Sequence, residues 1–197
     1  MNCKEERLSR RSILKTALGG CTLIPGSSLF IGTVVAAGNE FSEMRPTQLI
    51  NALRAIGKPV CIDAANTLMK MVNAGSAYNL HLRNADLNDA DARMLADAML
   101  QTNTDNHQLL ASFSASFNPG LGDTGATMLA KGFPGTMIEL GLVGCNIGDS
   151  GGLEILKWAK NAPDLRTLCI EGNRFSTDMR SQFYALAKNG RQLHVVV

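Results

Sequence analysis

Apolar and polar positions follow one pattern that returns four times between residue 80 and residue 177. The first copy reads L-x-L-x-x-A-x-L-x-D at residues 80–89, and related copies lie at 113–123, with one inserted residue, at 140–149 and at 168–177. The last apolar position of the copies falls at residues 87, 121, 147 and 175, which gives spacings of 34, 26 and 28 residues. The alternating start of each copy predicts a short strand with one buried face. The regular spacing predicts an array of stacked units.

A helix is expected after each copy, over about residues 90–101, 124–131, 150–161 and 177–188. Eight positions after the end of each strand turn stands one large apolar residue, and these residues form an inward ladder: Leu95, Leu129, Ile155 and Phe183. An oxygen-bearing side chain stands where each helix should begin, and it is expected to accept from the free N–H groups of the first turn. The predicted N-cap residues are Asp89, Asp123, Asp149 and Thr177.

This pattern resembles the leucine-rich repeats, specifically the long ribonuclease-inhibitor-like class, over residues 78–197. The resemblance implies an α/β fold, a short right-handed solenoid of about four to five repeats. It also implies that one side chain of each copy lies under the turn that leaves the strand, where it satisfies buried backbone groups. Asn118, Cys145 and Asn173 fit that role, whereas Ala85 cannot form such hydrogen bonds.

The two ends of the repeat region differ from its middle. A fifth strand is expected at residues 193–197, with Leu193 and Val195 in the places that Leu168 and Ile170 hold one repeat earlier. No helix follows it. Residues 38–77 are expected to form a helical N-terminal cap, with helices at 46–56 and 62–74 that present apolar residues at helical spacing.

Residues 1–37 have the order of a signal peptide, with a basic start, an apolar stretch and small residues before a cleavage site after Ala37. Arg10 and Arg11, followed by I-L-K two residues later, resemble the twin-arginine signal, which implies export of the folded chain to the periplasm or the medium. Two alternatives stay open. Cys21 stands in a sequence that resembles a lipobox and would be the lipid anchor of a lipoprotein, or the segment is retained as an uncleaved anchor.

Composition narrows the classes of partner. Of 197 residues, 45% are apolar and 5% are aromatic, which suits one ordinary core. Without residues 1–37 the chain carries 14 basic and 15 acidic side chains, a net charge of −1, and this near-neutral balance argues against nucleic acid. The cysteines that remain, Cys61, Cys145 and Cys169, form no C-x-x-C pair, so the sequence supports neither a zinc ribbon nor a redox pair.

Candidate chemistry is sparse. Residues Gly120–Gly125 match G-x-G-x-x-G, but part of that match returns one repeat later at 148–151, and Asp123 places a carboxylate where a pyrophosphate would bind. The histidines are too far apart along the repeat for one site, and no nucleophile elbow or carboxylate pair stands out. We therefore expect no enzyme activity, no cofactor and no metal. A cofactor or ligand site at Gly120–Gly125 stays an alternative, as does a structural role in the cell envelope.

The outward positions of the strands are the remaining candidate for function. Strand periodicity places small, mixed and nearly uncharged side chains there, which suits a protein or peptide partner. The candidate surface is His81, Arg83, Glu139, Val143, Thr167, Glu171 and His194, together with Val195 and Val197 beside the edge of the last strand. Because a final strand without a covering helix exposes unpaired backbone groups, a homodimer through this C-terminal edge is also expected. The sequence thus predicts a protein-protein interaction module whose partner it does not name.

Overall fold

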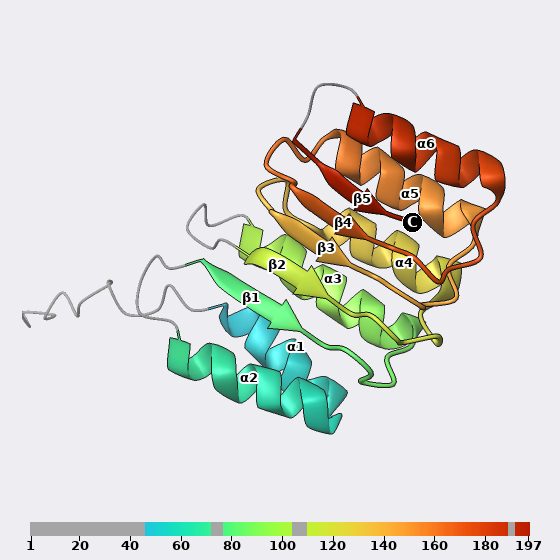
Figure 1. The fold of residues 1–197 in the computed structure, drawn as a ribbon. Helices are drawn as coiled ribbons and strands as arrows, with labels where there is room; N and C mark the ends of the chain where they lie inside the picture. The colour runs from blue at the N-terminus through green and yellow to red at the C-terminus, as the bar shows by residue number, and fades with distance from the viewer. Residues whose placement is uncertain (1–45, 72–76, 104–109, 189–191) are drawn as a thin grey trace, which may run out of the picture. The chain divides into compact units, whose positions relative to one another are not determined.

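The computed structural model describes residues 46–71, 77–103, 110–188 and 192–197, and these residues form an α/β fold. One parallel sheet has its strands in sequence order, β1-β2-β3-β4-β5 (Figure 1). Each strand is separated from the next by one helix, so every pair of neighbours is joined by the same strand–helix–strand connection. The strands are β1 Tyr78–His81, β2 Leu110–Ser114, β3 Glu139–Gly141, β4 Thr167–Cys169 and β5 His194–Val196.

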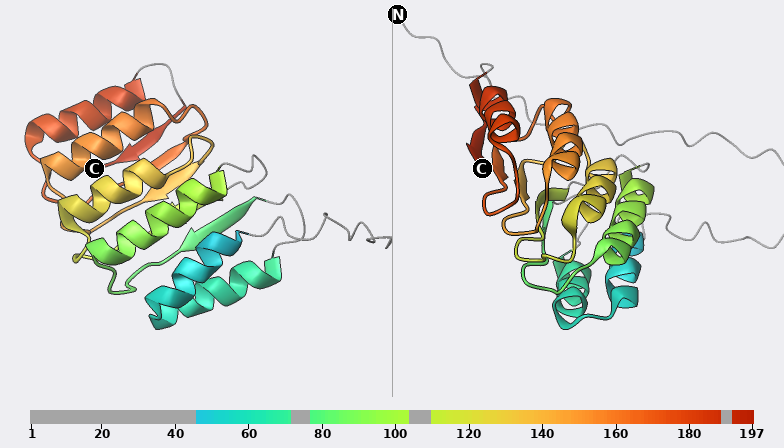
Figure 2. Two further views of the ribbon diagram at one scale, coloured as in Figure 1. Left: turned by 180° about the vertical axis from the view of Figure 1, so that it is seen from behind. Right: turned by 90° about the vertical axis from the view of Figure 1, so that its right-hand side faces the viewer.

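The described residues contain six helices, and all of them lie to one side of the sheet or beside its first strand. Figure 2 shows this layer of helices and, opposite it, a sheet face that no described helix covers. Helices α1 and α2 precede the sheet, and α2 lies next to β1. The bounds are α1 Thr47–Ile56, α2 Pro59–Met71, α3 Asp89–Asn103, α4 Gly122–Gly132, α5 Asp149–Lys160 and α6 Thr177–Lys188.

The predicted inward ladder of the helices is confirmed. Its four side chains are completely buried: Leu95, Leu129, Ile155 and Phe183. They fill the space between helices and sheet together with the apolar residues of the strands, in one continuous core. Helices α3 and α4 approach so closely that a Cβ on Gly132 would lie 2.7 Å from Cα of Ala96, which explains a glycine inside a helix.

Two buried asparagines satisfy the turns that leave the strands. Nδ2 of Asn173 donates to the carbonyl oxygens of Leu142 (2.7 Å) and Ile170 (2.8 Å), and Oδ1 accepts from the N–H groups of Cys145 and Ile147. Each amide therefore links its own turn to the turn of the preceding unit.

Asn118 does the same one unit earlier. It donates to Leu82 and Ala115 at 2.8 Å and accepts from the N–H of Leu87 at 2.9 Å. In the Cys145 turn, the thiol is within 3.2 Å of the carbonyl oxygen of Ala115, a weaker bond of the same kind.

The predicted N-cap role of the aspartates is wrong, because the helices begin one or two residues earlier than expected. Asp89 is the first residue of α3, and within the described part of the chain its carboxylate accepts only from the neighbouring N–H of Ala90. The cap of α3 is Asn88, whose Oδ1 accepts from the N–H of Asp91 at 3.0 Å, while Asp91 accepts from the N–H of Asn88 in return.

Asp123 and Asp149 cap the next unit instead of their own. Oδ1 of Asp123 accepts from the N–H of Gly148 at 2.6 Å and from that of Gly151 at 3.0 Å, at the start of α5. Oδ1 of Asp149 accepts from the N–H of Ser176 at 2.8 Å, directly before α6. A short carboxylate near the start of one helix thus reaches sideways to the start of the following helix.

Two helices are present in the segment expected to be helical before the sheet, and the second begins three residues earlier than expected. The buried residues of α2 are Cys61, Ala65 and Leu68, whereas Ile62 and Met69 are exposed. An ion pair of 2.6 Å between Lys58 and Asp91 joins this segment to α3.

The register of β1 to β4 is as the spacing predicts, and the register of β5 is not. Thr167 pairs with His194, Leu168 with Val195 and Cys169 with Val196, so β5 is shifted by two residues from the expected alignment. A shift of two keeps the same side chains facing the core. It moves Val195, rather than Leu193, beside Leu168.

The signal-peptide predictions, including Arg10, Arg11 and Cys21, lie outside the described residues. Among the helices that the structure does describe, none is long and apolar enough to cross a membrane.

Candidate interaction surface

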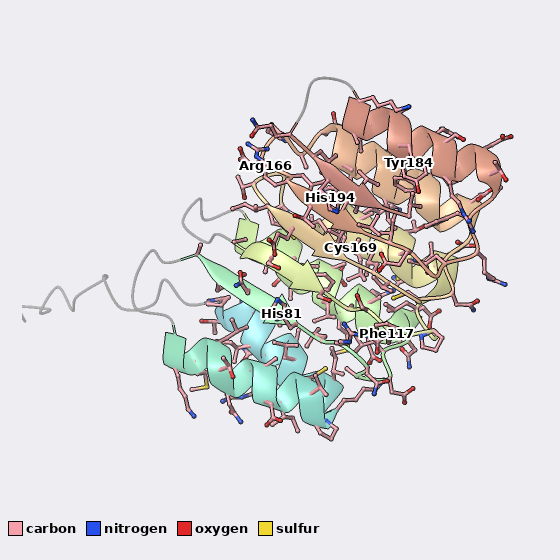
Figure 3. The ribbon with its side chains drawn as sticks, viewed as in Figure 1. His81, Phe117, Arg166, Cys169, Tyr184 and His194 are labelled. Carbon is pink, nitrogen blue, oxygen red and sulfur yellow. The ribbon has the colours of Figure 1, made fainter. Side chains whose placement is uncertain are left out.

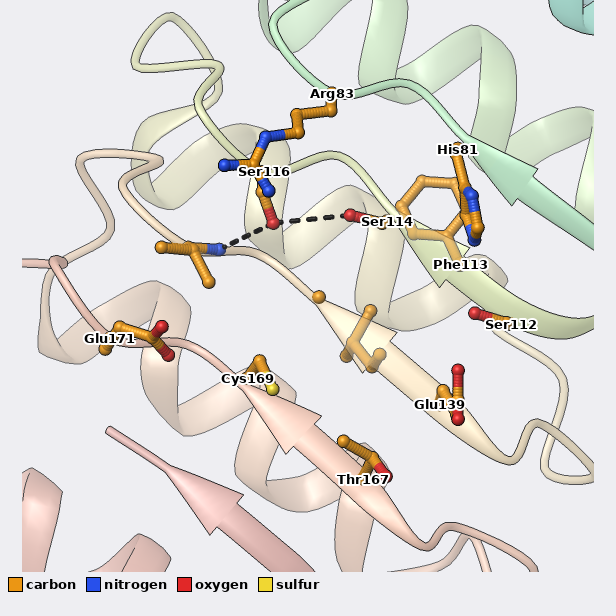
Figure 4. Close-up of a pocket in the computed structure, with 13 residues that line it drawn as sticks. His81, Arg83, Ser112, Phe113, Ser114, Ser116, Glu139, Thr167, Cys169 and Glu171 are labelled. Carbon is orange, nitrogen blue, oxygen red and sulfur yellow. Dashed lines mark hydrogen bonds between the residues drawn. The ribbon is translucent and has the colours of Figure 1, made fainter.

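The uncovered face of the sheet contains a hollow of about 440 Å³ above strands β1 to β4. Figure 4 shows it at close range. The residues that line it come from the strands and from the turns that follow them: His81, Arg83, Ser112, Phe113, Ser114, Ser116, Glu139, Leu140, Gly141, Val143, Thr167, Cys169 and Glu171. All six residues predicted for the candidate surface on β1 to β4 and their turns are among them.

The parallel register brings the outward side chains into rows across the strands. Ser112, Glu139 and Thr167 form one row, since they pair directly. Ser114 and Gly141 pair in the next row. The hollow is deep at this row because both residues are small. A Cβ on Gly141 would lie 3.1 Å from Oγ of Ser114, so the row is low at its centre.

Hydroxyl groups line the middle of the hollow. Oγ of Ser116 accepts from the N–H of Val143 at 3.1 Å and lies 3.3 Å from Oγ of Ser114 (Figure 4). These bonds hold both serines in place and use part of their hydrogen-bonding capacity. No strained nucleophile turn is formed, and neither serine is hydrogen-bonded to a histidine among the described residues.

Charges are distributed unequally around the hollow. His81 and Arg83 belong to β1 and its turn, whereas Glu139 and Glu171 belong to β3 and to the turn after β4. Among the described residues the ion pairs are Lys58–Asp91 and Glu154–Lys157, and neither involves the hollow. Its charged groups are therefore available to a partner.

Cys169 lies between the two carboxylates, and its thiol stays protonated at neutral pH. Burial raises its pKa, and the negative charges of Glu171 and Glu139 raise it further. Burial also raises the pKa of Cys145, and that of Cys61 to about 11. Because the thiolate is the reactive form, these thiols are poor nucleophiles.

His81 and His194 lie on the first and last strands of the sheet, far from one another (Figure 3). Across the described ranges, no three histidine, cysteine or acidic side chains come together in a way that would hold a metal ion. The third histidine, His107, lies outside the described residues.

The glycine-rich segment Gly120–Gly125 is filled by contacts within the chain. A Cβ on Gly120 would lie 2.8 Å from the carbonyl oxygen of Leu87, and the N–H of Gly122 donates to Cys145. At the equivalent place one unit later, the N–H groups at the start of α5 donate to Asp123. The hydrogen bonds of Asp123 with Ser150, Gly151 and Gly148 outweigh the effect of its partial burial, so its pKa is lowered and it is ionised there. At the starts of α4 and α5, N–H groups that could bind an anion thus donate to groups of the protein itself.

The candidate residues at the last strand lie partly elsewhere than expected. His194 is exposed, but the two-residue shift of β5 pairs it with Thr167 instead of placing it in the row of Cys169. Val195 and Val197 are partly buried and pack against the core.

Phe117 is the surface residue that the sequence analysis missed. Its ring is 40% exposed and lies under the guanidinium group of Arg83, 4.2 Å from the carbon to the ring centre. Figure 3 shows it at the turn that leaves β2, at the end of the sheet. The equivalent residues of the other units are Asn84, Gly144 and Gly172, so a large aromatic residue in that position was the available clue.

Comparisons with known proteins add no family to this picture. No protein-family model matches the sequence, and no curated protein matches it with significant similarity.

Proposed function

We propose that this chain is an exported leucine-rich repeat protein of the ribonuclease-inhibitor-like class, which binds a protein or peptide partner through the uncovered face of its sheet. In this proposal residues 78–197 are a right-handed solenoid, 38–77 are its helical cap, and 1–37 are a twin-arginine signal that directs the chain to the periplasm or the medium.

The repeat assignment is supported by equivalent hydrogen bonds in successive units. Asn118 bonds to Leu82 and Ala115, and Asn173 bonds to Leu142 and Ile170, which are the same positions of the pattern. A repeated amide with repeated partners is what a periodic sequence would produce if every copy folds alike.

The hollow on the uncovered face is the observation that carries the proposed function. The hollow is lined largely by small residues and by charged groups that form no ion pair within the described part of the chain. No described helix covers it. A concave surface of mixed polarity without an organised catalytic group suits recognition of another chain better than chemistry.

Filling the hollow should therefore abolish partner capture. Thr167→Trp adds a large side chain to its rim, and Leu153→Trp adds the same side chain to the exposed side of α5 as the matched control. We expect wild-type protein and the Leu153 variant to retain the same proteins from an envelope extract, and the Thr167 variant to lose them while its circular dichroism is unchanged. Equal retention by all three proteins would place the partner elsewhere.

A further inference from the structure

Phe117 has a backbone conformation that its own side chain disfavours. Its φ is +61°, and the equivalent residues Asn84, Gly144 and Gly172 have φ values of +51°, +62° and +72°. Glycine and asparagine tolerate this left-handed conformation, whereas a bulky aromatic residue does so at a cost in stability. Burial offsets that cost only in part, because Phe117 is 40% exposed. Strain of this kind concentrates at functional positions.

The strained ring positions Arg83. The guanidinium carbon of Arg83 lies 4.2 Å from the ring centre, and Gly144 leaves room for the ring from the other side, since a Cβ there would be 3.3 Å from Cδ1 of Phe117. Among the described residues Arg83 has no hydrogen bond or ion pair, so its planar set of N–H donors is held by stacking alone. Such a group is suited to bind a carboxylate with two parallel hydrogen bonds.

Glu171 is the complementary group on the other side of the hollow. Its Oε2 is buried, and within the described part of the chain it has no hydrogen-bond partner. A buried carboxylate oxygen without a partner is costly, and Glu171 lines the hollow with a side chain that is only partly buried. A cation in the hollow would bind the carboxylate once it turns outward, and that cost would be removed. Figure 4 shows Arg83 and Glu171 at two sides of the hollow, with Ser116 between them.

The separation of the two groups limits what can bind both. Arg83 and Glu171 hold equivalent positions of the first and fourth units, so three strand spacings of about 4.8 Å, or about 14 Å, separate their backbones. An extended chain rises about 3.3 Å per residue, so about four residues span that distance, and side chains four residues apart point to the same face.

We propose that the hollow binds an extended peptide segment that crosses the strands, with a carboxylate side chain on Arg83 and a cationic side chain, about four residues away, on Glu171. The proposal rests on the proposed function and names the chemistry of the partner. Phe117 is a positioning residue, because it acts through Arg83.

The test uses the purified full chain and a phage-displayed library of random dodecapeptides. We expect the enriched peptides to carry one acidic and one basic residue four positions apart. Synthetic copies should bind at least tenfold more weakly to Arg83→Glu, to Glu171→Gln and to Arg83→Lys, which keeps the charge without the planar donor set. Arg93→Glu, an exposed change on α3, is the matched control and should bind as the wild type does. The double variant R83E/E171R should enrich peptides with the order of the charges reversed.

Phe117→Gly distinguishes the role of Phe117 in positioning Arg83 from its contribution to stability. Glycine accepts the positive φ and alanine does not, whereas both remove the ring, so Phe117→Gly should melt at a higher temperature than Phe117→Ala. Both variants should bind the enriched peptides more weakly than the wild type. Equal melting temperatures would contradict the strain, and unchanged binding would overturn the role assigned to Phe117.

The outcomes also separate this inference from the proposed function. If no peptide is enriched while Thr167→Trp still abolishes partner retention from the extract, only this inference is overturned. If Thr167→Trp neither weakens binding of the enriched peptides nor abolishes that retention, the hollow is not the binding surface and both proposals are wrong. If peptides bind in the hollow without the charge pair, the proposed function stands and this inference is overturned.

Discussion

Asn173 illustrates how much one side chain contributes when it replaces several missing backbone partners. Its amide is 9% exposed and forms four hydrogen bonds, all with backbone groups of two successive turns. Arg174, its neighbour, is exposed, and its side chain donates at 3.2 Å to the carbonyl oxygen of Asn146. Two residues that are adjacent in the sequence can therefore contribute very differently to the free energy of unfolding.

Asn173→Ala should lower the free energy of unfolding by at least about 2 kcal/mol, because it leaves several buried backbone groups unpaired at about 1–3 kcal/mol each. Arg174→Ala should change it by less than about 0.5 kcal/mol, as surface substitutions usually do. Chemical denaturation of both variants measures the difference. Equal midpoints would contradict the role of the buried amide.

Phe117 and the aspartates show why residue-scale predictions succeed in part. The repeat pattern identified Asn118 and Asn173, since an amide in a repeated turn has one obvious use. It also placed Asp123 near a helix start, but a pattern along the chain does not say whether a short carboxylate bonds to its own helix or to the next one in space. The stacking of Phe117 on Arg83 depends equally on contacts between units.

At the scale of elements, the starts of α5 and α6 depend on a carboxylate of the preceding unit. Helix α5 has Gly148 at its N-cap, which offers no side chain, and the carboxylate of Asp123 supplies the missing acceptor. Gly151 is required there, because a Cβ on it would lie 2.9 Å from Cα of Asp123. The glycines of this segment therefore serve close packing.

Stability conferred by Asp123 should depend on pH. Its folded-state pKa is below the ordinary value, so the folded protein favours the ionised form. The stabilisation is complete above the ordinary pKa and is lost as pH falls through the folded value. Asp123→Asn should be less stable than the wild type at pH 7, by about 1 kcal/mol, as for a lost helix cap.

Urea titrations between pH 7 and pH 2.5 measure this difference, which should shrink below about pH 4, where an unperturbed aspartate becomes protonated. Asp97→Asn, an exposed change in α3, serves as the control. A difference that stays constant over the whole range would show that the charge of Asp123 does not contribute.

The alignment of strand β5 could not be predicted from the sequence. Its alternating apolar residues fit the core face equally well in two alignments that differ by two residues, and only contacts with α6 and β4 decide between them. The N–H of His194 donates to Arg166, and the carbonyl oxygen of Val196 accepts from Ile170. The backbone groups of Val195, between them, consequently point to the free edge of the sheet.

If this edge joins two copies of the chain, Val195→Pro should abolish the dimer, since proline removes the free N–H without removing a bond to β4. Val195→Thr keeps the N–H and the branched side chain, so it should dimerise as the wild type does. Sedimentation of the three proteins tests this expectation. A wild-type protein that sediments as a monomer at all concentrations would rule out pairing through β5.

For the whole molecule, the sequence predicts the α/β class, the number of strands, their order and the buried ladder. These features follow from periodic apolar positions such as Leu95 and Phe183, and such positions must be buried in any fold of the repeat. The sequence predicted which side chains face outward from the strands, but it did not predict that they surround a hollow. Its depth comes from Gly141, and its available charges come from the absence of ion pairs to Glu139 and Glu171 among the described residues.

Export is the prediction that concerns the entire chain. A receptor reads the arginine pair rather than positive charge in general, so Arg10→Lys with Arg11→Lys should leave full-length precursor inside the cell. Fractionation followed by immunoblotting measures the distribution. Lys4→Arg, which keeps the pair and the charge, is the control, and normal export of the double variant would exclude the twin-arginine route.

Neighbouring units are interlocked in both directions along the chain. Asp123 and Asp149 reach forward to the helix that follows, whereas Asn118 and Asn173 reach back to the turn that precedes. Among the described residues, both kinds of bond meet between the third and fourth units, through Asp149 and Asn173. A break there leaves the start of α6 without the carboxylate of Asp149 and the turn of the third unit without the amide of Asn173. These two units should therefore unfold together instead of singly.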